Sequence, residues 1–244
     1  MELFAVAATV AAIIAGAIAS IAGFGIGSVL TPVLATAFDV RLAIALVSLP
    51  HLCGTIARFV MVRRHIDRDV LLGFGAASAA GGLAGAALQA VVRNDALALI
   101  FGALLVFAGV TSLAGLARRM RIRGRAAALA GGALSGLLGG LVGNQGGIRA
   151  AALLGFDVER DAFVATATAV ALIVDGARIP VYLATQGSAI AAHAPLVAML
   201  SVGALVGTIA GGWLLRRIPE AVFRRIVGLL LLALGGYTLS RALL

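Results

Sequence analysis

Gly23-Phe24-Gly25-Ile26-Gly27 and Gly143-Asn144-Gln145-Gly146-Gly147 are two glycine-rich stretches about 120 residues apart in the chain. Each is followed by the same Phe-Asp-Val triplet, at residues 38–40 and 156–158, and then by a long apolar segment that contains an Ala-Arg pair. Glycine permits the backbone conformations that a sharp break in a helix requires. Paired breaks in a duplicated apolar chain are typical of secondary transporters, so this repeat predicts the fold.

The composition predicts a membrane protein. Apolar residues make up 62% of the chain and charged residues only 12%, and the mean hydropathy is +1.12. A soluble domain of this size cannot bury so large an apolar share. The net charge of +9 comes mostly from short basic patches between apolar runs, which is a topology signal and does not indicate nucleic-acid binding. We therefore expect an all-α polytopic membrane protein in contact with the lipid bilayer.

Enzyme and metal signatures are absent from the sequence. The single cysteine, Cys53, lies in an apolar run, which excludes an intrachain disulfide and a metal site built on thiolates. No Walker-type phosphate loop, His-Glu-x-x-His or Gly-x-Ser-x-Gly motif occurs. An intramembrane enzyme acting on lipid head groups would have to use His51 with Asp175 as its acid–base pair. We expect no enzymatic activity, no metal and no cofactor.

The lengths of the apolar stretches predict how often the chain crosses the bilayer. One crossing needs about 20 apolar residues. Residues 2–38 and 125–155 are too long for one crossing, and each contains a glycine-rich stretch, so each is either an overlong tilted helix or a bent hairpin. Six other stretches each fit one crossing: 41–62, 70–92, 96–117, 161–184, 194–215 and 221–243.

Basic loops favour the hairpins, because short loops rich in Lys and Arg stay in the cytoplasm. The loops 63–69 and 118–125 and the region 216–225 are basic, whereas the loop 185–193 is uncharged and is expected outside. If residues 125–155 crossed only once, the region 216–225 would lie outside with its four arginines. A hairpin keeps every basic loop inside.

The same topology predicts two oppositely oriented repeats, residues 1–120 and 121–244, that form one membrane domain. Each repeat consists of a Gly-bent hairpin and three transmembrane helices. The hairpin arms of the second repeat are expected to be about 15 residues long, which leaves full crossing and a re-entrant loop both open. Glycines at four-residue spacing, such as Gly81 and Gly85, predict close helix packing.

The two bends are the main candidates for binding a substrate. Backbone that leaves a helix at membrane depth must be satisfied by protein or by a cavity. Helices that start after such bends direct N–H groups toward the centre, where an anion is favoured; the alternative is a tight turn between packed helices. The candidate binding residues at the bends are Gly25, Gly27, Ser28, Asn144, Gln145, Gly146 and Gly147.

Two repeat-related arginines, Arg58 and Arg178, lie well along apolar segments. A charge inside a membrane usually faces a cavity or a partner, so both are candidates to bind an anion. Alternatively, Arg58 snorkels to the nearby basic loop and Arg178 pairs with Asp175. Arg149 follows the second bend and either helps to bind the anion or pairs with Asp157 or Glu159.

Several polar residues are candidates to line a pathway. Ser48, Thr166 and Thr168 recur downstream of the two Phe-Asp-Val triplets, although hydroxyls in membrane helices often bond to their own backbone. His51 is either a proton-coupling site or a hydrogen-bonded structural histidine. Asp175 completes this candidate pathway. The first repeat has Ser28 and Thr31 near its bend.

Other polar and aromatic residues are expected to have structural roles. Asp39 and Asp157 are predicted to cap the helices that follow them. Tyr182, near the end of a predicted segment, is interpreted as an anchor at the membrane interface.

The chain resembles the TauE/SafE family of sulfite exporters. The resemblance depends on the motif from Ala22 to Ser28 with Pro32, on Ala45-Leu-Val-Ser-Leu-Pro50, and on the glycine-rich run 135–147. It implies an inner-membrane permease for sulfur-containing anions such as sulfite, sulfoacetate or related organosulfonates, with the two bends as the substrate site.

The function expected from these features is that of a secondary transporter, in the exporting direction, for a small anion. It would work by alternating access around a central site. An anion channel and a non-transporting membrane subunit are the alternatives, and proton coupling and homo-oligomerisation are both compatible with the sequence.

Overall fold

The fold is all-helical throughout the part of the chain that the structure describes. The structure is a computed structural model, and it describes residues 2–22, 25–115, 124–143, 146–153, 156, 159–214 and 220–243. Within these residues, eight helices are long enough and apolar enough to cross a membrane. The predicted all-α polytopic membrane architecture is confirmed at this level.

Six of these helices correspond to the six predicted single crossings, and all of their ends agree within a few residues except the end of α8. α3 leads into α4 through the short 3-10 helix η1 (Arg63–His65). Asp39 caps α3 as predicted, because its carboxylate accepts the backbone N–H of Leu42 at 2.9 Å. The six helices are α3 (Val40–Val62), α4 (Arg68–Val91), α5 (Asn94–Leu113), α8 (Arg160–Ala192), α9 (Ala194–Leu214) and α10 (Glu220–Leu243).

The expected loop at residues 185–193 is wrong, because α8 continues as a helix through Ala192. No proline interrupts residues 185–192, and the Thr185 hydroxyl bonds back to the Val181 carbonyl at 2.8 Å. The helix ends only before Pro195, which cannot donate a backbone hydrogen bond to continue it. At 33 residues, α8 is longer than one crossing requires.

The two overlong stretches are hairpins with unequal arms. Residues 2–38 form α1 (Glu2–Ala22) and the nine-residue α2 (Ile26–Leu34). Residues 125–155 contain α6 (Arg125–Val142) and the eight-residue α7 (Gly146–Leu153). The expected pair of 15-residue arms is therefore wrong. A nine-residue helix rises only about 14 Å, so α2 and α7 are too short to cross the hydrocarbon core.

Both ends of the first hairpin lie at the same end of the helix bundle. The Phe38 ring, just after α2, makes an edge contact with the Phe4 ring near the start of α1, at 6.1 Å between centroids. Phe38 also contacts His193, between α8 and α9, at 4.9 Å. The chain therefore enters through α1 and returns to the same end before α3 begins.

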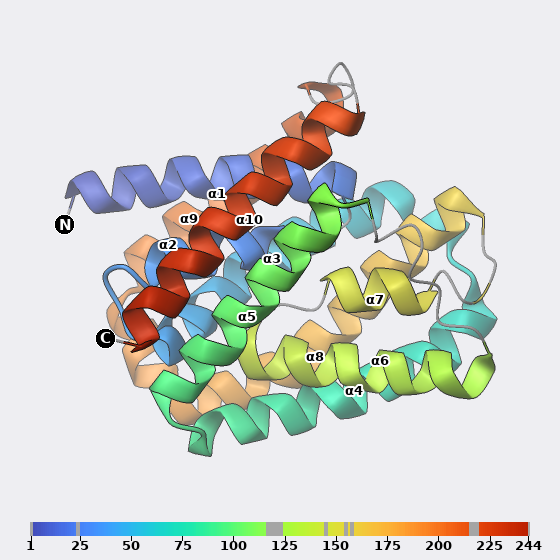
Figure 1. The fold of residues 1–244 in the computed structure, drawn as a ribbon, viewed down its shortest axis with the longest axis horizontal. Helices are drawn as coiled ribbons and strands as arrows, with labels where there is room; N and C mark the ends of the chain where they lie inside the picture. Colours follow the sequence, from blue (N-terminus) through green and yellow to red (C-terminus); the bar gives the residue numbers. More distant parts are fainter. Residues whose placement is uncertain are drawn as a thin grey trace.

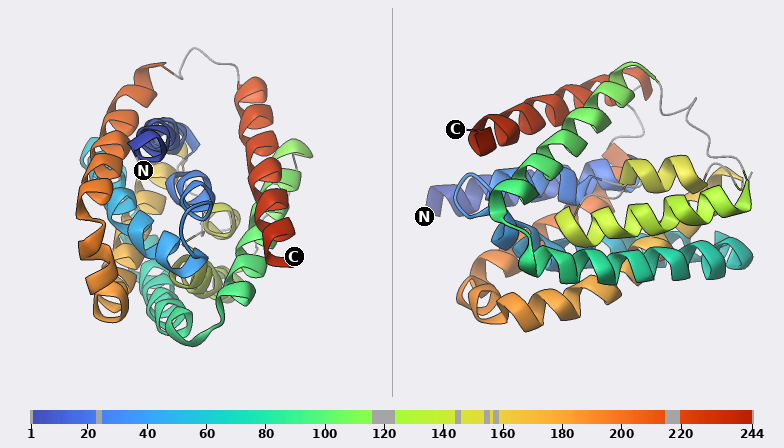
Figure 2. Two further views of the ribbon diagram at one scale, coloured as in Figure 1. Left: turned by 90° about the vertical axis from the view of Figure 1, so that its left-hand side faces the viewer. Right: turned by 60° about the horizontal axis from the view of Figure 1, so that its bottom comes forward.

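The helix pairings keep their pattern when the two halves are exchanged. α1 packs on α9 and α4 on α6, α3 packs on α9 and α4 on α8, and α5 and α10 pack on each other at one edge of the bundle (Figures 1 and 2). In the middle, α3 packs on α8, and each short helix packs on the first arm of its own hairpin.

Glycines bring the backbones of paired helices into contact. A Cβ atom at Gly81 would collide with the Ala133 carbonyl, and one at Gly85 with the Leu137 carbonyl, which shows that α4 and α6 run parallel. On α9, a Cβ atom at Gly207 would collide with the Ile13 carbonyl of α1. The predicted close packing at glycines is confirmed.

We expect Gly85→Ala to destabilise the protein, because the added methyl group meets backbone and cannot be accommodated by a side-chain rotation. Overpacking of this kind costs about 1–3 kcal/mol. Thermal unfolding of the detergent-solubilised protein would measure it. Gly236→Ala on α10 is the control, because nothing lies within 4 Å of its added Cβ. Equal unfolding midpoints for both variants would contradict the close packing.

Candidate functional site

The two hairpin bends touch each other in the middle of the bundle. Gly25, which precedes α2, has a φ of 145°, and Gly143, which ends α6, has a φ of 72°; L side chains rarely adopt either value. A Cβ atom at Gly27 would lie 2.5 Å from the Gly143 carbonyl oxygen. The structure thus brings the first bend against the second, although they are far apart in the sequence.

The short helices α2 and α7 both begin at this meeting point. In α2 the first bond along the helix runs from the Val29 N–H to the Gly25 carbonyl at 3.0 Å. The preceding N–H groups therefore have no acceptor within the helix. Gly146 and Gly147 are the first two residues of α7. Ser28 is buried in α2, and Asn144 and Gln145 lie outside the described residues.

Arg58 lies buried at the centre and does not snorkel to the interface. Its side chain is 5% exposed. Its Nε donates to the Thr168 hydroxyl at 2.9 Å, and its Nη1 donates to the Ala19 carbonyl at 2.6 Å. Arg58 therefore connects α3 with α8 and with the end of α1.

Arg178 reaches the second bend and also pairs with Asp175, so the pairing predicted as an alternative is confirmed. Its Nε and Nη2 donate to Asp175 Oδ1 at 2.9 and 2.8 Å. Its Nη1 donates to the Gly139 carbonyl at 2.8 Å and lies 3.5 Å from the position of a Cβ atom at Gly143.

Asp175 links the two central helices. Its second oxygen, Oδ2, lies 2.7 Å from His51 Nδ1 on α3. Tyr182, one turn after Arg178, is fully buried and donates its hydroxyl to the Gly140 carbonyl. The predicted interface role of Tyr182 is wrong, because α8 extends ten residues past it.

Buried positive charge gathers around the two bends. Arg58, Arg149 and Arg178 are 5%, 2% and 1% exposed, and Asp175 is the one buried carboxylate among the described residues. Arg149, on α7, interacts electrostatically with the other two arginines and with Asp175. We call these three arginines and Asp175 the central cluster. Positive charge at membrane depth is costly unless negative charge offsets it.

The hydroxyls of the predicted pathway have different partners. The Ser48 hydroxyl bonds to the Ala45 carbonyl of its own helix at 2.6 Å, which is the structural alternative. The Thr168 hydroxyl accepts the Arg58 Nε–H and donates to the Val164 carbonyl at 2.7 Å. The Thr166 hydroxyl accepts the Asp67 backbone N–H at 3.0 Å.

Thr31 is a central residue to which the sequence assigned no role. It is fully buried on α2, and its Oγ1 has no hydrogen-bond partner within the described residues. Oγ1 lies 3.9 Å from the position of a Cβ atom at Gly143, a position that is also 3.5 Å from Arg178 Nη1. The sequence alone does not single out Thr31, because most threonines in this chain's helices donate their hydroxyls to a carbonyl of the preceding turn and a threonine without that bond looks the same in the sequence.

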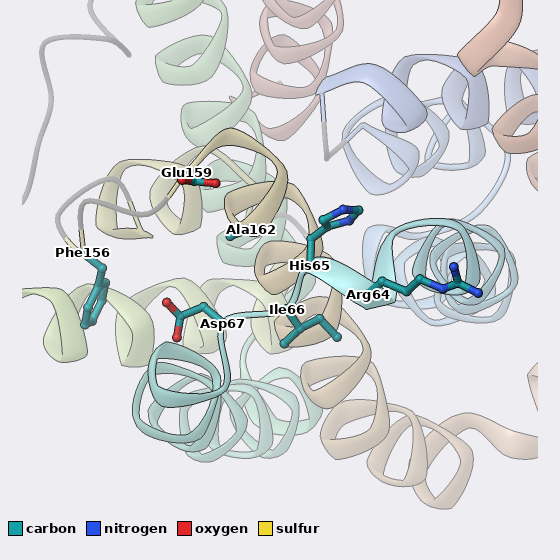
Figure 3. A pocket seen from close by; sticks show the side chains of 7 residues that line it. All are labelled: Arg64, His65, Ile66, Asp67, Phe156, Glu159 and Ala162. Carbon is teal, nitrogen blue, oxygen red and sulfur yellow. The ribbon is translucent and has the colours of Figure 1, made fainter.

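An open pocket of about 480 Å³ lies at the end of the bundle that contains the basic loop 63–69. Arg64 and His65 of η1 line it together with residues from the start of α8, and Phe156 and Arg64 lie on opposite sides of it (Figure 3). Ala162 of α8 lies one helical turn before Thr166, whose hydroxyl is bonded to Asp67. The pocket therefore approaches the central cluster along α8 but stops short of its buried arginines.

Asp175→Asn is expected to lower the free energy of unfolding by about 3 kcal/mol or more, because it leaves the arginines without their buried counter-charge. Asp95→Asn is the matched control. Its salt bridge with Arg93 spans 3.1 Å between side chains that are 69% and 85% exposed, so it contributes little. Thermal unfolding in detergent measures both, and equal midpoints would show that Asp175 does not neutralise the cluster.

The comparisons with known proteins agree with this geometry. The family model described as Sulfite exporter TauE/SafE matches residues 8–238, which include both bends and all three buried arginines. No curated protein and no solved structure matches the chain. Because the family match spans nearly the whole sequence, the chain belongs to the TauE/SafE sulfite exporter family, whose members are membrane transporters of sulfur anions and not enzymes.

Proposed function

We propose that this protein is a secondary transporter that exports sulfite or an organosulfonate such as sulfoacetate through a site at the two bends. The burial of three arginines in the central cluster is the observation that supports this proposal most directly. Both substrates present three oxygens on one sulfur, with negative charge spread over them. Such an anion matches the planar fork of guanidinium donors.

The groups around Gly143 are suited to hold such an anion away from water. Arg178 Nη1 and Thr31 Oγ1 lie 3.5 and 3.9 Å from the position of its Cβ atom. A substrate oxygen there would accept from the guanidinium and from the Thr31 hydroxyl. The N-terminal N–H groups of α2 would add further donors of fixed direction. Arg58 and Arg149 would supply the remaining positive charge.

We further propose that residues 1–120 and 121–244 are inverted repeats and that transport proceeds by alternating access. The exchange of helix pairings between the two halves supports this. The directions of the helices support it as well. α1 begins at the end of the bundle where Phe38 and His193 lie. α4 begins at the other end, where α3 finishes, and α6 runs parallel to α4, so α1 and α6 begin at opposite ends. The burial of the central arginines favours a carrier with a closed site over an open channel.

Sulfite and sulfoacetate flux into proteoliposomes tests the function, with sulfate and a carboxylate of similar size as competitors. We expect saturable uptake of a sulfur anion by the wild type. Arg58→Gln and Arg178→Gln should each raise KM roughly ten- to hundredfold, because each removes a charge-assisted hydrogen bond. Arg93→Gln, at an exposed position, is the control. Wild-type KM in both central variants would remove the arginines from the site.

Thr31→Val tests the bound position of the anion. The substitution keeps the shape of the side chain and removes a hydroxyl that has no partner within the described residues, so protein stability should hardly change. KM should rise roughly three- to tenfold if the hydroxyl donates to the substrate. Thr238→Val is the matched control, because that buried hydroxyl bonds to the Leu234 carbonyl of its own helix at 2.8 Å. An unchanged KM for Thr31→Val would place the anion elsewhere.

A further inference from the structure

Asp175 holds a different partner on each of its carboxylate oxygens. Oδ1 accepts from Arg178 Nε and Nη2 at 2.9 and 2.8 Å, and Oδ2 lies 2.7 Å from His51 Nδ1. Because an ionised carboxylate can only accept, Nδ1 of a neutral His51 carries the hydrogen of this bond. Nε2 is then the ring atom of His51 that can take up a proton.

His51 is the member of this group that a proton can reach. Its side chain keeps 11% of its surface accessible, whereas that of Asp175 keeps none. The charged groups that act on His51 are Asp175 and Arg178 of α8 and Arg58 of α3. Arg149 of α7 interacts electrostatically with the same three groups.

The other helices packed on α3 leave this group of charges undisturbed. α2 and α9 contain no ionisable residue. α1 and α5 have only Glu2 and Asp95, each in its first turn. The remaining ionisable side chains on α3, η1 and α8 are Arg41, Cys53, Arg63, Arg64, His65, Arg160, Asp161 and Tyr182. No second carboxylate is buried near His51 among the described residues.

We propose that His51 binds a coupling proton and that the protein co-transports protons with its anion, an inference that rests on the proposed function. Arg178 is shared between Asp175, which it holds on Nε and Nη2, and the transported anion, which it meets at Nη1. A proton on His51 turns its bond with Asp175 into an ion pair, which holds the carboxylate on the His51 side and frees Arg178 for the anion.

Charge balance acts in the same direction. Protonation of His51 adds one positive charge to the central cluster, so the anion binds more tightly. By linkage, the bound anion raises the affinity of His51 for its proton by the same factor. The proton and the anion therefore bind together and leave together, and anion affinity falls as pH rises through the titration of His51.

Sulfoacetate uptake into proteoliposomes tests the coupling, with the membrane potential clamped at zero. Both acid groups of sulfoacetate stay ionised near neutral pH, so its own charge does not change with the gradient. An inward proton gradient of one pH unit should raise wild-type accumulation by up to roughly tenfold. A pH-sensitive dye inside the vesicles should report acidification of the lumen when sulfoacetate is added outside.

His51→Gln should keep sulfoacetate exchange between the two sides but lose both the gradient-driven accumulation and the acidification. His193→Gln is the matched control, since that ring bonds to the Ala189 carbonyl at 2.8 Å at the end of the bundle, and its response should equal the wild type. If His51→Gln aggregates, His51→Asn is assayed in its place.

The outcomes separate the coupling from the function. If wild-type uptake is saturable but does not depend on the proton gradient, the coupling is overturned and the proposed function is retained. Wild-type accumulation by the His51 variants overturns the assignment of the proton to His51. If the wild type transports neither sulfoacetate nor sulfite at any pH, the proposed function is overturned and the coupling with it.

Discussion

Positive charge buried at membrane depth is the constraint on which the rest of the site depends. Arg58, Arg149 and Arg178 are almost fully removed from solvent, and Asp175 is the one carboxylate buried with them among the described residues. Lipid offers no groups that could solvate such charges. Carbonyls near the bend ends of α1 and α6, those of Ala19 and Gly139, accept hydrogen bonds from Arg58 and Arg178. The first arms of both hairpins therefore help to hold the buried arginines close to the bends.

Close packing at glycines makes this arrangement rigid. α4 with α6, and α1 with α9, approach until backbone touches backbone. Each of these pairs joins the first arm of one hairpin to a helix of the other half. A bend in one half is thus held by a crossing helix from the other, and the small helices α2 and α7 lie between the packed pairs.

The two halves share a backbone plan but differ in their chemistry. Thr55 stands three residues before Arg58, as Asp175 stands three residues before Arg178. The Thr55 hydroxyl lies 3.5 Å from His51 Nδ1, the same nitrogen that approaches Asp175. One half therefore supplies the histidine and a neutral hydroxyl, and the other supplies the carboxylate. This asymmetry gives the centre one histidine and one counter-charge, which two identical halves would not provide.

The sequence by itself determined the membrane class, the eight long apolar segments, the two bends and the central arginines Arg58 and Arg178. These features are local, because hydropathy over about 20 residues decides a crossing and glycine decides where a helix can break. Only the tertiary structure decided that α8 extends to Ala192, that the returning hairpin arms are short, and that Tyr182 is buried. It also brought together His51 and Asp175, which are 124 residues apart, placed Arg149 in the central cluster, and left the Thr31 hydroxyl facing the second bend. These contacts join helices distant in the chain, so they depend on which helix faces pack together, and no local pattern of residues specifies that.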